Sequence, residues 1–242
     1  MRLAPGVLAA MAVACGSGRG PAVVPTAIAP EDTAFVHLEG GEFVTSWGES
    51  VSVEPFDIGR NEVSCRLYAC LAPEADIEMP PEPLYPGLQP YFADYPDLPA
   101  VNMTATEADS AAAVLGCRLP TATEWEYAAS RGLSGPFADQ YPWGSLPPDE
   151  ASNPANYLAG DQWDTRNADG YLFPAPVGSY PLSSVGLADL AGNVAEWTSP
   201  VDGSSRVYGG SWDSPSEQLR IGSWKLQAAG DRARHIGFRL AR

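Results

Sequence analysis

The chain has 242 residues, 45% of them hydrophobic, which is enough for one domain of about 200 residues with a sizeable core. Its 24 glycines and 24 prolines predict a loop-rich fold, and its 7 tryptophans and 10 tyrosines exclude a disordered low-complexity protein, because such large rings are there to be buried. A net charge of −16 without a basic stripe disfavours nucleic acid as a partner.

The first 15 residues have the pattern of a secretory signal peptide. Arg2 precedes an apolar run from Val7 to Val13 that is too short to span a bilayer. The sequence AVAC at its end is typical of a bacterial lipobox, which predicts a lipid on Cys15 that holds the protein on a membrane. Residues 16–33 predict a flexible tether. We therefore expect a bacterial cell-envelope lipoprotein, and the alternative is a soluble periplasmic or secreted product.

The domain itself is expected to span residues 34–242 and to begin with short strands. Two strand-like runs, 35–38 and 41–44, flank a Gly-Gly turn, and strand character returns over 56–63. A helix follows, with Ser64 as its N-cap and Pro73 as its stop. Residues 73–99 are rich in Pro, Glu, Asp and Tyr and predict a loop insertion whose tyrosines press onto the body of the domain.

Two capping boxes predict the next two helices. Thr104 and Glu107 open a helix that Gly116 closes, and the TATE sequence at 121–124 opens a helix that ends before Gly132. Short runs that combine glycine with large apolar residues follow and predict small strands in one compact sheet. These runs lie at 141–144, 178–181, 208–212 and 237–239.

The stretch 185–197, VGLADLAGNVAEW, predicts a tight polar turn between apolar anchors. It places the side chains of Asn193 and Glu196 and the carbonyls of Gly192 and Val194 within a few residues of one another. Hard oxygen ligands clustered in this way are what Ca²⁺ requires. The alternative interpretation is that Asn193 and Glu196 satisfy buried amides of the turn.

Several runs, taken together and in this order, resemble the domain of the formylglycine-generating enzymes, also called sulfatase-modifying factors. The runs are 118–128 (RLPTATEWEYA), 141–144 (YPWG), 176–180 (PVGSY), 186–197 (GLADLAGNVAEW), 209–212 (GGSW) and 237–239 (GFR). The resemblance covers residues 34–242. It implies an α+β fold related to the C-type lectin fold, with few short helices and small sheets.

Active members of that family bind copper with two cysteines that follow the GGS-aromatic turn and oxidise a substrate cysteine to formylglycine. Soft thiolates suit Cu(I). In this sequence the two positions are Ser214 and Leu219, so we expect neither copper nor this oxidation. Other relatives hold iron with three histidines, which this chain cannot do because it has only His37 and His235.

The resemblance also implies two structural calcium sites. The first would use the side chains of Asn156 and Asp169 and the carbonyls of Tyr157 and Tyr171. The second would use the turn at 192–196. Both sets consist of hard oxygen donors, so we expect Ca²⁺ as a structural cofactor.

If Cys15 carries a lipid, three cysteines remain for the folded domain. Cys65 and Cys70 lie too close along one helix to bridge each other, so Cys117 with either of them is the candidate disulfide. A redox-active pair is the alternative.

These observations favour a non-catalytic binding or accessory module whose groove takes a peptide, a glycan or an envelope protein. The groove would be lined by Trp197, Ser211, Trp212, Asp213, Ser214 and Arg239.

Two alternatives remain open. One is an enzyme of altered chemistry with Ser214 or Ser211 as nucleophile and Asp213, Glu217 or His235 as base. The other is a structural scaffold in an envelope complex.

Overall fold

The computed structural model describes residue 28 and residues 30–151, 155–159 and 169–242. Cys15 and most of the tether lie outside the described residues, so the signal peptide, the lipobox and the envelope location stay predictions. None of the helices in the described ranges has the length and apolar character needed to cross a membrane.

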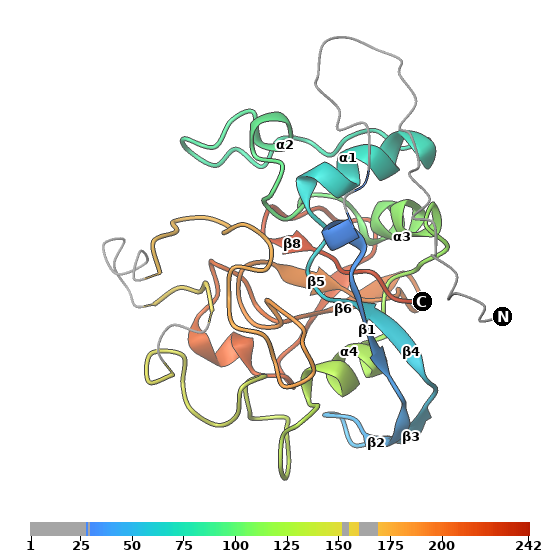
Figure 1. The fold of residues 1–242 in the computed structure, drawn as a ribbon, viewed down its shortest axis with the longest axis vertical. Coiled ribbons are helices and arrows are strands. Elements are labelled where there is room, and N and C mark those ends of the chain that lie inside the picture. Colours follow the sequence, from blue (N-terminus) through green and yellow to red (C-terminus); the bar gives the residue numbers. More distant parts are fainter. Residues whose placement is uncertain (1–27, 29, 152–154, 160–168) are drawn as a thin grey trace, which may run out of the picture.

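The N-terminal strands form two separate pairs along one side of the domain (Figure 1). Strand β1 (Phe35–Leu38) pairs antiparallel with β4 (Phe56–Gly59), and β2 (Gly41–Val44) pairs antiparallel with β3 (Ser50–Val53). The runs on either side of the Gly-Gly turn therefore belong to different sheets, and the predicted strand over 56–63 ends at Gly59. Gly40 has a φ of +73°, and a Cβ there would lie 2.1 Å from the Val53 carbonyl oxygen. The chain crosses from one pair to the other at this residue, where only glycine fits.

The helices begin where the capping signals predict. The Ser64 hydroxyl accepts a hydrogen bond from the Leu67 amide at the start of α1 (Cys65–Glu74). Both predicted capping boxes form, one on α3 (Ala105–Ala113) and one on α4 (Ala122–Ala129). Pro73 does not stop α1. It lies inside the last turn, where its ring removes one N–H to C=O bond of the helix, and the helix ends one residue later at Glu74.

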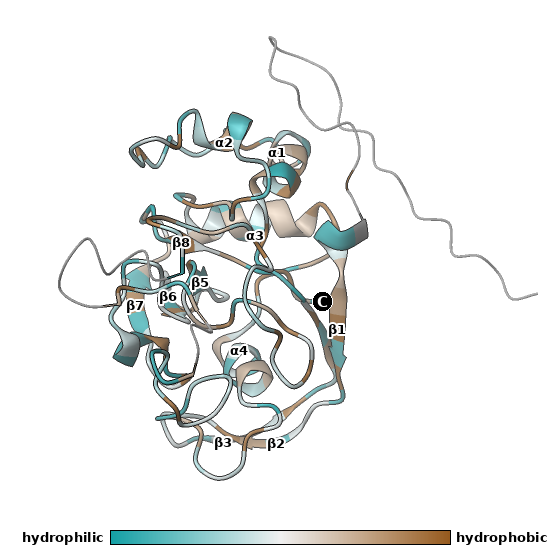
Figure 2. Cartoon of the chain, turned by 60° about the vertical axis from the view of Figure 1, so that its left-hand side comes forward, coloured by the Kyte–Doolittle hydropathy of each residue, from teal (hydrophilic) through white to brown (hydrophobic). Residues whose placement is uncertain are grey.

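A four-stranded sheet lies between α3 and α4 (Figure 1). Its order is β7 (Lys225–Ala228), β6 (Ser204–Tyr208), β5 (Ala195–Trp197) and β8 (Ile236–Gly237). Strands β5 and β8 are parallel, and the other neighbours are antiparallel. The predicted small strands at 141–144 and 178–181 are turns instead, and most of the chain between the labelled elements runs as loops (Figure 2).

The insertion at 73–99 packs onto the body as predicted. It contains one short helix, α2 (Tyr91–Asp94), and the side chains of Tyr85 and Tyr91 are fully buried. Tyr85 stacks on Phe173 with ring centroids 4.9 Å apart and meets Trp212 edge-on at 5.6 Å. The insertion therefore adds aromatic rings to the core, and these rings pack against Trp212 in the segment after β6.

The predicted disulfide between Cys117 and Cys65 or Cys70 does not form. Cys65, Cys70 and Cys117 are buried and form no disulfide with one another. Cys65 lies in the aromatic cluster under α2, and Cys117 packs with the residues around α3. The two thiols belong to different parts of the core, which explains why no bridge forms.

Candidate functional site

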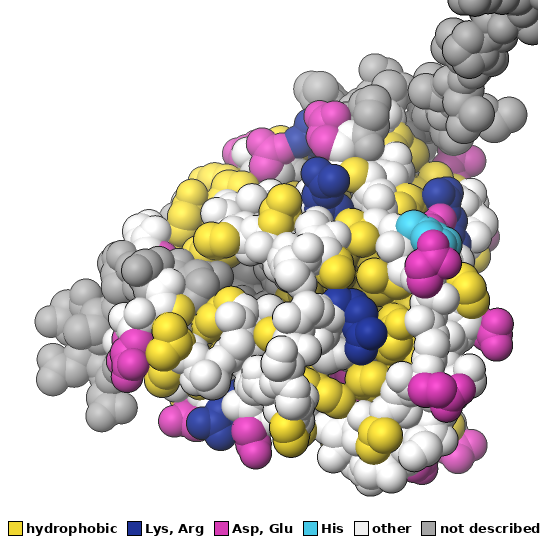
Figure 3. Space-filling view, turned by 60° about the horizontal axis from the view of Figure 1, so that its bottom comes forward, with side chains coloured by type: hydrophobic (Ala, Val, Ile, Leu, Met, Phe, Trp, Pro, Cys, Tyr) yellow, Lys and Arg dark blue, Asp and Glu magenta, His cyan; other side chains and the backbone are white. Residues whose placement is uncertain are grey.

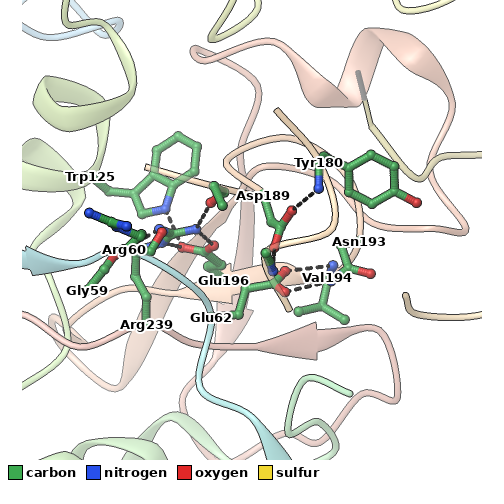
Figure 4. Close-up of polar contacts among 12 residues, drawn as sticks. Gly59, Arg60, Glu62, Trp125, Tyr180, Asp189, Asn193, Val194, Glu196 and Arg239 are labelled. Carbon is green, nitrogen blue, oxygen red and sulfur yellow. Dashed lines mark hydrogen bonds and ion pairs between the residues drawn. The ribbon is translucent and has the colours of Figure 1, made fainter. Parts of the chain in front are cut away.

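A buried ion pair lies at the centre of the domain (Figure 4). The Arg239 guanidinium, fully buried, donates to both carboxylate oxygens of Glu196 at 2.5 and 2.6 Å. The Trp125 indole N–H donates to the same carboxylate at 2.7 Å. The remaining guanidinium N–H groups bond the carbonyls of Gly59, Arg60 and Ala188. This one pair therefore ties α4, β4, β5 and the C-terminal segment together.

A second buried carboxylate, Glu62, lies beside this pair and was not predicted. It accepts from the Asn193 side-chain amide at 2.6 Å and from the Val194 backbone N–H at 3.1 Å. The Asn193 side-chain oxygen in turn accepts from the Ala175 N–H at 2.8 Å. Asn193 adopts a φ of +57°, a conformation that Asn tolerates better than most residues. Glu62 thus fixes the turn at 192–194 from 131 residues away in the sequence.

A third buried carboxylate, Asp189, makes this region more acidic than basic. Asp189 accepts from the backbone N–H groups of Gly178 and Tyr180, yet burial raises its pKa to about 6. Burial, with Asp189 and Glu196 nearby, also raises the pKa of Glu62 well above its ordinary value. The pKa of Arg239 is raised by Glu196 despite its burial, so the guanidinium stays charged. Three carboxylates share one guanidinium, and protonation of Asp189 or Glu62 relieves the imbalance.

The predicted calcium ligands Gly192, Asn193, Val194 and Glu196 lie at this polar centre, and calcium there stays a prediction. Both oxygens of Glu196 are engaged by Arg239, and the side-chain oxygen of Asn193 is engaged by the Ala175 N–H. Both side chains therefore already have protein partners in this arrangement. The alternative interpretation fits better for Asn193, because it does satisfy a buried amide of a neighbouring loop.

The first predicted calcium set lies around residues 156 and 169. The Asn156 side-chain amide donates to the Phe173 carbonyl at 2.9 Å. The Asp169 carboxylate accepts from the Tyr171 N–H at 3.0 Å and from the Tyr180 hydroxyl at 2.6 Å. The described ranges contain no group of three His, Cys, Asp or Glu side chains that could hold a metal, but this set relies on Asn and on carbonyls. Calcium bound by Asn156, Tyr157, Asp169 and Tyr171 stays a prediction.

A small pocket of about 40 Å³, which we call the Ser214 pocket, lies beside β5, β6 and β7. It brings together Ser214, Lys225 and His235 from three successive segments of the C-terminal part of the chain. Its lining residues are Ala195, Val207, Gly210, Ser214, Gln218, Ser223, Trp224, Lys225, Gln227, His235 and Ile236. Burial and the neighbouring Lys225 lower the pKa of His235, so its imidazole is neutral at pH 7.

Ser214 and Leu219, the two positions predicted to match the family's cysteines, are held by local packing. The Ser214 hydroxyl accepts from the Ser211 N–H at 3.0 Å and lies 3.1 Å from the Ser211 hydroxyl. Leu219 is fully buried in the cluster around Tyr141 and Tyr157. None of the residues that line the Ser214 pocket is a cysteine.

The other residues predicted to line a groove do not line this pocket. Trp197 is fully buried, and its indole N–H donates to the Met103 carbonyl. Arg239 is buried in the central ion pair. Trp212 is only 3% exposed and packs against Tyr85. Ser211 is also buried, and Asp213 is exposed outside the lining, so of the six predicted residues only Ser214 lines the pocket.

The face shown in Figure 3 carries many separate acidic side chains, and its basic side chains stand apart from one another. Its hydrophobic side chains are distributed among the polar ones. This distribution on one face agrees with the negative charge of the chain.

Comparison with known proteins identifies the family. The model of the sulfatase-modifying factor enzyme 1-like domain matches residues 21–242. The chain belongs to this family. It is 33% identical over 174 residues to the formylglycine-generating enzyme of Streptomyces coelicolor, a match that covers 60% of this chain and 53% of that enzyme.

Other members differ in what they are named for. The inactive C-alpha-formylglycine-generating enzyme 2 of Mus musculus is 33% identical over 158 residues, which cover 60% of this chain and 49% of the relative. The hercynine oxygenase of Mycolicibacterium thermoresistibile is 36% identical over 148 residues, which cover 55% of this chain and 30% of the relative. The chain thus spans about half or less of the length of these relatives.

Solved structures confirm the predicted fold. PvdO from Pseudomonas aeruginosa superposes with a TM-score of 0.65 at 23% identity and covers 88% of this chain and 95% of PvdO. CarF superposes with a TM-score of 0.66 at 22% identity and covers 87% of this chain and 98% of CarF. The domain is a loop-rich α+β member of the fold of formylglycine-generating enzymes.

Proposed function

We propose that this chain is a non-oxidase member of the sulfatase-modifying factor family that binds a peptide, a glycan or an envelope protein. The observation that carries the proposal is the pair Ser214 and Leu219 at the positions of the family's copper-binding cysteines. A serine hydroxyl bonded within its own turn and a fully buried leucine offer no thiolate pair. The binding role is supported by the Ser214 pocket, which keeps polar and basic groups around a hollow at the family's former reactive position.

The oxidase part of the proposal is tested with a cysteine-containing peptide under air, with copper supplied. Mass spectrometry is expected to find no conversion of cysteine to formylglycine. The relative from Streptomyces coelicolor, assayed alongside, serves as the positive control. Conversion by this chain at a rate within tenfold of the control would overturn the proposal.

The binding part is tested by removing one wall of the pocket. His235→Ala deletes a lining side chain, and Asp139→Ala changes a residue whose side chain is 96% exposed outside the pocket. Envelope extracts are passed over both variants and the wild type after each has been shown to keep its melting temperature. A ligand held by the pocket is retained by the wild type and by Asp139→Ala and is lost from His235→Ala. Equal retention by all three proteins points to the scaffold role instead.

An enzyme of altered chemistry is the second candidate, because the structure places Ser214 and a neutral His235 around one pocket. The bonds from Ser211 to the Ser214 hydroxyl favour a structural role for this serine. A fluorophosphonate probe is therefore expected to leave the protein unlabelled. Labelling that disappears in both Ser214→Ala and His235→Ala would favour the enzyme.

We also propose that the chain is anchored at the cell envelope by a lipid on Cys15 and that Ca²⁺ binds at Asn156, Tyr157, Asp169 and Tyr171. The lipobox and the oxygen-rich spacing support these two statements. Cys15→Ala is expected to move the protein from the membrane fraction to the soluble fraction. Asp169→Ala is expected to abolish any rise of the melting temperature on adding calcium, and a wild type that does not respond to calcium argues against the site.

A further inference from the structure

Strand β7 forms one end of the four-stranded sheet (Figure 2). Among the described residues it pairs only with β6. Leu226, in the middle of the strand, is 66% exposed, and Trp224 just before it is 36% exposed. The outward N–H and C=O groups of an edge strand with exposed apolar side chains can pair with a further strand.

The backbone of Leu226 faces away from the sheet. The Ala229 N–H donates to the Gly203 carbonyl at 2.8 Å, so residues 203 and 229 form a hydrogen-bonded pair. Such pairs alternate along antiparallel strands. Gln227 and Lys225 therefore bond β6, and the N–H and C=O of Leu226 point outward. The Ala228 carbonyl, which also points outward, already accepts from the Asp231 N–H.

The two faces of the β6–β7 pair each carry a pocket. On one face Leu226 and its partner Arg206 line a pocket of about 500 Å³ together with Trp47 and Asp202. On the other face Lys225 and Gln227 line the Ser214 pocket. Side chains of a strand added along β7 would alternate between these faces, because successive residues of a strand point to opposite sides.

The larger pocket has a fixed wall. The Arg206 guanidinium lies 3.8 Å from the centroid of the Trp47 ring and 4.6 Å from that of Trp224. Stacking of a cation between two indoles holds all three side chains in place. A preformed wall lowers the entropy lost when a ligand side chain packs against it.

The side chains of β7 define what the added strand should carry. A residue opposite Leu226 meets an exposed leucine beside Asp202, which favours an apolar residue over an acidic one. A residue opposite Lys225, the single lysine of the chain, is favoured when acidic. The neighbouring Gln227 donates to Asp231, which keeps that carboxylate occupied.

We propose that the outer edge of β7 binds an extended peptide segment of a partner protein by strand addition. An apolar residue of the segment packs over Leu226 and Arg206, and an acidic residue next to it lies beside Lys225. The peptide's backbone bonds the N–H and C=O of Leu226. This mode of recognition draws affinity from main-chain hydrogen bonds and specificity from alternate side chains.

The probe for the test is a fluorescent hexapeptide in which valine and glutamate alternate, and the readout is fluorescence anisotropy with the full domain. A second peptide replaces glutamate with lysine, and a third is N-methylated at alternate amides. The wild type should bind the glutamate peptide about three- to tenfold more tightly than the lysine peptide. The N-methylated peptide should not bind, because it cannot pair with Leu226.

Two variants distinguish strand addition at β7 from nonspecific peptide binding. Lys225→Glu should reverse the preference, so that the lysine peptide becomes the tighter ligand. Leu226→Pro should abolish binding and keep the fold, since the N–H that proline lacks faces away from β6 at this position. Arg60→Glu changes the same amount of charge at an exposed residue outside this edge and should leave both affinities unchanged.

Three outcomes would overturn the proposal. The first is equal binding of the parent and N-methylated peptides, and the second is the same preference in Lys225→Glu as in the wild type. The third is a dimer of the wild type that Leu226→Pro dissociates while no peptide binds. This last result would assign the edge to a second copy of the chain. Leu226 does not line the Ser214 pocket, so failure of strand addition leaves the proposed function to its own test with His235→Ala.

Discussion

The polar centre around Arg239 and the Ser214 pocket differ in how their polar groups are satisfied. At the centre, every N–H direction of the Arg239 side chain meets a carboxylate or a carbonyl, and the residues are fully buried. The pocket, in contrast, is lined by Lys225, which is exposed, and by His235, which is half-buried. Removing a partner at the centre would therefore leave a buried polar group unsatisfied, whereas the exposed part of the pocket wall is open to water.

The largest effect is expected from removing the central cation. Arg239→Met leaves Glu196 uncompensated beside Glu62 and Asp189. Removing one partner of a buried pair typically costs about 3–5 kcal/mol. Urea denaturation measures the loss. Arg220→Met, at an arginine that lies 3.9 Å from Asp139 near the surface, is the matched control and should cost less than about 1 kcal/mol. Similar losses for the two variants would remove the contrast between the regions.

An intermediate effect is expected from Asp189, and it depends on pH. Its folded pKa of about 6 lies above the usual value for an unfolded chain, about 3.9. The folded state therefore binds this proton more tightly than the unfolded state does. The resulting stabilisation of the fold is present at low pH and is lost as the pH rises through 6. When the pH is lowered from 7.5 to 5.5, the free energy of unfolding of the wild type should rise by roughly 1 kcal/mol relative to that of Asp189→Asn.

Melting curves of both proteins at the two pH values test this prediction. The lowered pKa of His235 acts in the opposite direction, because the unfolded state takes up its proton more readily. This contribution is common to both proteins and cancels in the comparison. A difference between wild type and variant that does not change with pH would contradict the raised pKa of Asp189.

The smallest effect is expected in the pocket wall. Lys225→Ala removes an exposed side chain that lines the Ser214 pocket, and its cost in stability should stay within about 0.5 kcal/mol. Urea denaturation under the conditions used for Arg239→Met measures it. A cost above about 2 kcal/mol would show that the pocket wall is as important for the fold as the polar centre is.

Local signals in the sequence predicted local structure well. The capping boxes of Thr104 with Glu107 and of Thr121 with Glu124 form because each needs only residues three positions apart. The Ser64 cap forms for the same reason. The family motifs predicted the fold, which the comparisons confirm.

Long-range partners were not predictable from the sequence. Glu62 bonds a turn 131 residues away, and nothing next to it in the sequence marks it as buried. The family resemblance predicts Arg239 in a groove, but Glu196, 43 residues earlier, neutralises it in the core. Trp197 and Trp212 were assigned to the groove for their position in the motifs, yet large rings next to short strands have more surface to bury than a shallow pocket provides.

The three cysteines of the described domain form no disulfide with one another, so no bridge among them holds its core together. Burial raises the pKa values of Cys65 and Cys117, which keeps both protonated and poorly reactive. Each thiol becomes reactive when the part of the core around it opens. The rate at which a thiol reagent modifies Cys65 thus reports how often the aromatic cluster beneath the insertion opens, without any engineered label.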